Sequence, residues 1–95
     1  METYETYKQK MIARLDKCSA EIDALDVKAE NAVADVKLKY VEELDMLHTK
    51  KREAAKKIKE LEAASGEAWE NAKLTTDEVL EDLGFGLAQA NYKFM

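Results

Sequence analysis

The chain has 95 residues, of which 37% are charged and 46% hydrophobic, and its net charge is −5. This length has room for one domain at most, and the negative charge argues against nonspecific nucleic-acid binding as the main role. No stretch approaches the ~18 apolar residues of a membrane span. The N-terminal METYETYKQK lacks the apolar region of a secretory signal. The single cysteine, Cys18, excludes an intrachain disulfide, so a reducing cytoplasm is the expected compartment.

The first predicted element is one continuous helix over residues 3–64, because neither glycine nor proline precedes Gly66. Its apolar residues follow a heptad pattern, with one eleven-residue step between Val36 and Leu47. A rod of this length spans about 90 Å and cannot fold back without a turn. The apolar seam is therefore expected to pack against a second chain, in a dimer or tetramer. The residues assigned to this oligomer interface are Met11, Leu15, Cys18, Ile22, Leu25, Val36, Tyr40, Leu44, Leu47, Ile58 and Leu61.

The stretch ASGEAW holds the first glycine, Gly66, and the only tryptophan, Trp69. Glycine in a helix interior costs roughly 1 kcal/mol relative to alanine. Two alternatives remain open at this point: a hinge or chain reversal at Ser65-Gly66, or an uninterrupted helix. The chain accordingly divides into residues 1–65, a long coiled-coil helix, and residues 66–95, a C-terminal amphipathic helical segment and tail.

A second, short amphipathic helix is predicted over residues 76–83. Thr75 fits the N-cap of a capping box with Glu78 three residues later, and Gly84 fits the position after the last helical residue. Apolar residues around this segment form a stripe that we assign to contact with a partner or a membrane surface: Trp69, Leu80, Leu83, Leu87 and Phe94. Packing against another helix is favoured over a membrane, because residues 60–95 carry a net charge of −6.

Charge is distributed in blocks along the chain. Residues 50–59, KKREAAKKIK, carry a net charge of +5 between two acidic regions. A parallel, in-register dimer would place this block beside itself, which is unfavourable. Two arrangements avoid this contact. In one, two chains run antiparallel and the block faces acidic residues around 26–35; in the other, the chain reverses at Ser65-Gly66 and segment 67–82 lies on the block. Antiparallel association is preferred.

The candidate reactive residues do not form a catalytic or metal-binding set. His48 is the only histidine, whereas a metal site needs several ligands. Cys18 has no visible base partner and is expected to pack in the seam. The basic block contains Glu53, which favours a solvated or partner-facing helix surface over a nucleic-acid site. We therefore expect no enzyme activity, no cofactor, no bound metal, no small-molecule substrate and no nucleic acid.

Two C-terminal stretches, SGEAWENAK and LEDLGFGLAQANYKF, resemble the end of a group of small bacterial coiled-coil proteins, sometimes labelled stress-response proteins of a cyanobacterial type. That group carries an SG-x-AWE motif and a second aromatic residue eleven positions on. Leu80 stands where its second tryptophan is expected, and Thr75 where it tends to have glycine. The resemblance implies no catalytic residues. The expected function is that of a non-catalytic, self-associating coiled coil with a structural or stress-related role. The alternative is a peripheral membrane protein that binds through its C-terminal segment.

Overall fold

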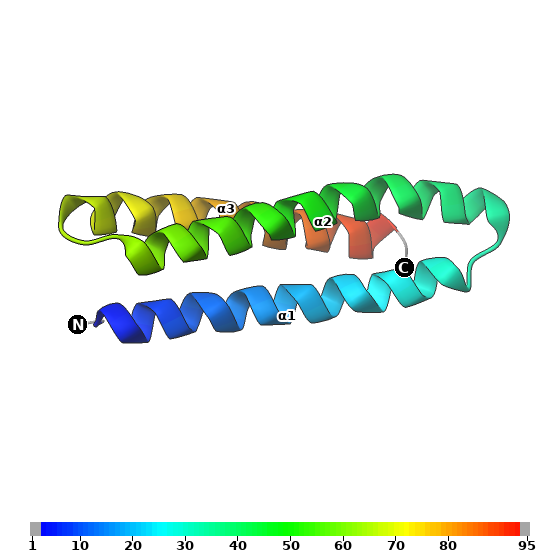
Figure 1. Cartoon of the computed structure of the whole chain (residues 1–95). Coiled ribbons are helices and arrows are strands. Elements are labelled where there is room, and N and C mark those ends of the chain that lie inside the picture. The colour runs from blue at the N-terminus through cyan, green and yellow to red at the C-terminus, as the bar shows by residue number, and fades with distance from the viewer. Residues whose placement is uncertain (1–2, 94–95) are drawn as a thin grey trace.

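In the computed structural model, which describes residues 3–93, the chain forms three α-helices joined by two short turns. Helix α1 spans Tyr4–Glu30, α2 spans Ala34–Ala63 and α3 spans Glu67–Lys93. Helix α2 runs antiparallel to α1 and α3, and the three helices lie side by side in a bundle of 51 × 18 × 17 Å (Figure 1). The described residues contain no strand, so the fold is all-α.

The first turn shows that the predicted continuous helix over residues 3–64 is wrong. Asn31 is the C-cap of α1: its backbone N–H makes the last regular helix bond, to the carbonyl of Val27 at 3.3 Å, and its side-chain amide donates to the same carbonyl at 3.1 Å. The backbone N–H of Ala32 then donates to the carbonyl of Ala29 at 3.2 Å, a tighter bond that satisfies a carbonyl at the helix end. Val33 then adopts an extended conformation, with φ −67° and ψ 157°, before α2 begins. An asparagine therefore ends this helix without help from glycine or proline.

The second turn lies between α2 and α3, where the chain reverses again. Gly66 has φ +60°, in the left-handed region that side chains with a Cβ adopt at a cost. Its carbonyl accepts the backbone N–H groups of Trp69 at 3.1 Å and Glu70 at 3.4 Å. These bonds form the first turn of α3, so the glycine stands immediately before a new helix.

Helix α3 is continuous over 27 residues, which corrects the predicted short helix over 76–83. Thr75 is not an N-cap: its hydroxyl donates to the carbonyl of Asn71 at 2.9 Å, inside the helix. Thr76, beside it, is fully buried, and its hydroxyl donates to the carbonyl of Lys57 in α2 at 3.5 Å. Gly84 lies within the helix and does not end it.

The apolar seam is buried inside a single chain, because the turn at residues 31–33 folds α1 onto α2. This corrects the expectation that the seam needs another chain to cover it. Of the residues assigned to an oligomer interface, Leu15 and Cys18 are half-buried against the core and Val36 is 39% exposed. The others lie in the core of the bundle: Met11, Ile22, Leu25, Tyr40, Leu44, Leu47, Ile58 and Leu61. All three helices contribute to this core, so a division at residue 66 does not separate two packing units.

Candidate interaction surfaces

The stripe assigned to a partner or a membrane lies mostly in the core of the bundle. Leu80, Leu83 and Leu87 are at most 2% exposed, because folding α3 onto α1 and α2 buries this face. Trp69 is half-buried, and Phe94 lies outside the described residues. The assignment is therefore corrected for the three leucines, which are not available to an external surface in this fold. None of the helices in residues 3–93 is long and apolar enough to cross a membrane.

Trp69 belongs to an aromatic cluster that joins the N-terminal ends of α1 and α3. Its ring centroid lies 4.5 Å from that of Tyr4 and 5.6 Å from that of Tyr7, the latter in an edge-to-face arrangement. The ammonium of Lys73 lies 5.3 Å from the Tyr7 ring centroid and 6.0 Å from that of Trp69. Such geometries are favourable beyond the area they bury. The cluster therefore explains the position of the only tryptophan by packing within the chain.

Hydrogen bonds reinforce this aromatic cluster. The hydroxyl of Tyr7 donates to Asp77 at 2.8 Å and to the carbonyl of Lys73 at 3.0 Å. The carboxylate of Asp77 also forms an ion pair with the guanidinium of Arg14, at a distance of 3.6 Å. The hydroxyl of Tyr4 donates to the last turn of α2, at the carbonyls of Leu61 and Glu62. These interactions connect all three helices at one end of the bundle. We call it the aromatic end and define it by Tyr4, Tyr7 and Trp69.

The candidate reactive residues lie apart from one another. His48 of α2 is one-third exposed and its Nε2 lies 3.2 Å from the carboxylate of Asp26 in α1, so it links two helices. Cys18 faces α3, and burial raises the pKa of its thiol, which reduces the thiolate fraction at neutral pH. Within residues 3–93, no three histidine, cysteine or acidic side chains are grouped so that they could hold a metal ion.

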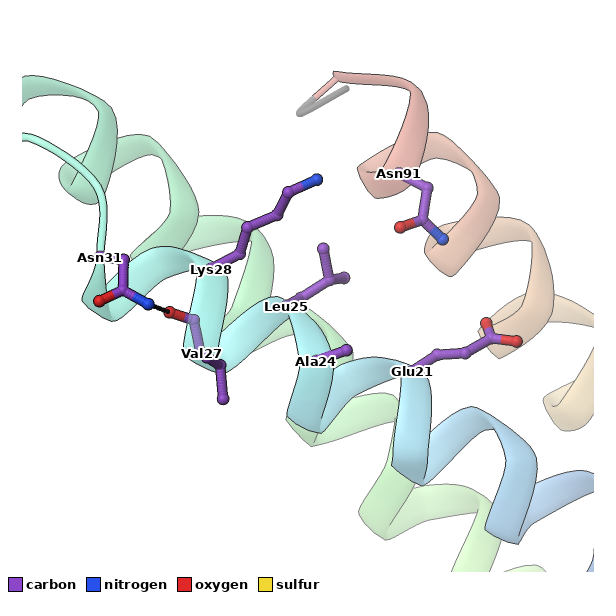
Figure 2. A pocket seen from close by; sticks show the side chains of 7 residues that line it. All are labelled: Glu21, Ala24, Leu25, Val27, Lys28, Asn31 and Asn91. Atoms are coloured by element: carbon purple, nitrogen blue, oxygen red, sulfur yellow. Dashed lines mark hydrogen bonds between the residues drawn. The ribbon is translucent and has the colours of Figure 1, made fainter.

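Two open hollows lie along the side of the bundle between α1 and α3. The one nearer the aromatic end is lined by Arg14, Lys17, Cys18, Glu21, Leu80 and Gly84. Glu21 also lines the adjoining hollow of about 600 Å³, together with Ala24, Leu25, Val27, Lys28, Asn31 and Asn91. Figure 2 shows Glu21, Leu25 and Lys28 projecting from α1 toward the gap, with Asn91 facing them from α3. We call these two neighbouring hollows together the α1/α3 groove.

The outward side of α3, next to this groove, carries exposed apolar side chains. Residues at alternating steps of four and three form one stripe, which we call the outer α3 face: Leu74, Glu78, Glu81, Phe85, Ala88 and Tyr92. The exposed fractions of Leu74, Phe85 and Tyr92 are 65%, 66% and 81%. The sequence places Phe85 and Tyr92 near the stripe assigned to a contact surface, but they were not recognised as a separate face, because the apolar pattern of that stripe is stronger. The signal was the heptad spacing of a second, weaker stripe.

A second exposed apolar region lies where α1 turns into α2. Its residues are Val27, Val33, Val36, Leu38 and Val41, and we call it the hairpin end. Helix α3 ends at Lys93, which pairs with Glu43, so the first turns of α2 extend beyond the last turn of α3 (Figure 1). Beyond the last turn of α3, only α1 and α2 pack against each other, and no third helix covers their apolar side chains. These side chains are therefore exposed because α3 ends before the turn between α1 and α2.

Comparisons of the chain with models of protein families, with curated proteins and with solved structures found no match.

Proposed function

We propose that the chain is a non-catalytic, self-associating helical protein with a structural or interaction role. The observation that carries the proposal is the outer α3 face, where three large apolar side chains stay exposed although the core is complete. Single exposed apolar residues are ordinary, but several large ones along the same face of one helix are typical of an interaction surface. Each Å² of apolar area removed from water contributes about 25 cal/mol.

The chemistry of the reactive groups supports the non-catalytic part of the proposal. A nucleophilic cysteine needs a lowered pKa, whereas burial raises the pKa of Cys18. His48 lies against Asp26, and the two side chains act as a link between α1 and α2. The stress-related role is part of the proposal as well, and its support is the resemblance of the SGEAWENAK motif to small bacterial stress-response coiled coils.

Analytical ultracentrifugation over a wide concentration range tests the proposal. We expect the average mass to rise from one chain toward two while circular dichroism shows constant helix content, because the single-chain bundle is already folded. A mass of one chain at the highest usable concentration would contradict self-association.

A further inference from the structure

We propose that two copies of the chain pair through α3, with the two helices crossing antiparallel near Gly84 and Phe85. In this dimer, the outer α3 face of each copy lies in the α1/α3 groove of the other. The inference rests on the proposed self-association and specifies its surface and its orientation. Three observations support it: matching lengths, a glycine that the single chain does not require, and the pattern of charge.

The groove and the outer α3 face have similar lengths. On α1, the groove runs from Arg14 to Asn31, which is about 25 Å at 1.5 Å per residue. On α3, the exposed stripe runs from Leu74 to Tyr92, which is about 27 Å. A helix from a second copy therefore fits the groove over its whole length.

Gly84 has no role in the packing of the single chain. A Cβ built on Gly84 would have no atom within 4 Å, whereas one built on Gly86 would lie 3.3 Å from Cδ2 of Leu47. Gly86 is therefore explained by the close approach of α2 to α3. Glycine is unfavourable in a helix interior, so Gly84 needs a comparable reason. A second copy that brings its backbone close to α3 supplies that reason.

The charges of the outer α3 face favour the antiparallel orientation. In a parallel pair, Glu78 and Glu81 would lie beside the same carboxylates of the second copy, and like charges placed together oppose binding. In an antiparallel pair that crosses near Gly84 and Phe85, Glu81 lies level with Ala88 and Glu78 with Tyr92, so the carboxylates of the two copies are kept apart. The hydroxyl of Tyr92 can donate a hydrogen bond to a carboxylate.

The same contact is self-complementary, because each copy offers both the stripe and the groove. An assembly with two-fold symmetry about such a contact is complete with two chains, and the contact surface of each chain is then covered by the other. Leu38, on α2 at the hairpin end, belongs to neither the outer α3 face nor the lining of the α1/α3 groove. This gives a matched control: Leu38 is 71% exposed and Phe85 is 66% exposed, and only Phe85 lies on the proposed interface.

The first experiment compares Phe85→Glu with Leu38→Glu by sedimentation equilibrium. We expect Phe85→Glu to weaken dimerisation at least about tenfold, the effect of losing a central apolar contact. Leu38→Glu should leave the dimer unchanged, and circular dichroism should show the wild-type helix content in both variants. Gly84→Ala, whose Cβ would have no atom of its own chain within 4 Å, should also weaken the dimer.

The second experiment determines orientation by disulfide crosslinking in a Cys18→Ala background. Glu81→Cys mixed with Ala88→Cys should give a heterodimer crosslink, whereas Glu81→Cys alone should not crosslink. Both positions are exposed, so neither substitution disturbs the core.

The outcomes separate the two proposals. A wild-type chain that stays monomeric contradicts self-association and the α3 dimer together. A wild-type dimer that survives Phe85→Glu, or dissociates with Leu38→Glu, overturns the α3 interface and leaves self-association intact. A crosslink of Glu81→Cys with itself overturns the antiparallel orientation.

Discussion

The two ends of the bundle are held by different means. At the aromatic end, tyrosine hydroxyls donate to α2 and α3, and Trp69 lies between Tyr4 and Tyr7. At the hairpin end, Val33 and Leu38 are each 71% exposed, and the turn is held by backbone and asparagine bonds. Because the ring contacts and tyrosine hydrogen bonds of the aromatic end join all three helices, we infer that this end contributes more tertiary stability than the exposed hairpin end. The hairpin end is therefore expected to open first in local unfolding.

The largest expected effect comes from removing the tryptophan at the aromatic end. Trp69→Ala should lower the free energy of unfolding by about 2–3 kcal/mol, since it removes two aromatic contacts and leaves a half-filled space. Leu38→Ala, at the hairpin end, should change it by less than about 0.5 kcal/mol. Urea denaturation at low protein concentration measures both values without a contribution from association. Equal losses of unfolding free energy for Trp69→Ala and Leu38→Ala would contradict the inference that the aromatic end is the more stable one.

The sequence predicted the helical class and the buried face of each helix better than it predicted what covers that face. Heptad spacing identified Met11, Ile22, Leu25 and Leu61, and the structure buries all four. Periodicity reports which side of a helix avoids water, and it contains no information on whether the cover is the same chain or another. That is why a seam assigned to an oligomer is found inside a single-chain bundle.

The two turns also show what the sequence can and cannot predict about local structure. Gly66 was recognised as a candidate turn because glycine often interrupts helices, and in the structure it has a φ of +60°, which glycine adopts without strain. Asn31 was overlooked, although its side chain caps α1, because asparagine is also tolerated within helices. The aromatic cluster could not be found from the sequence, since Tyr7 and Trp69 come together only after two chain reversals.

The turns give the next prediction, one at each end of the bundle. Gly66→Ala should cost about 1–2 kcal/mol, because alanine is strained at positive φ. Gly66→Asn should recover part of this loss, since asparagine tolerates that conformation. Asn31→Ala should cost about 0.5–1 kcal/mol, because the side-chain bond to Val27 is lost while the backbone bond remains. Thermal denaturation of the three variants provides the measurement. A larger loss for Asn31→Ala than for Gly66→Ala would reverse the expected order.

The last comparison removes a single hydroxyl group near each end of the bundle. Tyr7→Phe keeps the ring against Trp69 but removes the donor to Asp77 and to the carbonyl of Lys73, so it should cost about 1 kcal/mol. Tyr92→Phe removes the same atom from a side chain that is 81% exposed, and the folded monomer should lose almost nothing. Both variants are compared by urea denaturation, again at low protein concentration. Because the two substitutions are chemically identical, any difference between them reports the surroundings of the hydroxyl. If Tyr7→Phe were as neutral as Tyr92→Phe, the hydrogen bonds at the aromatic end would contribute nothing, and its stability would rest on ring packing alone.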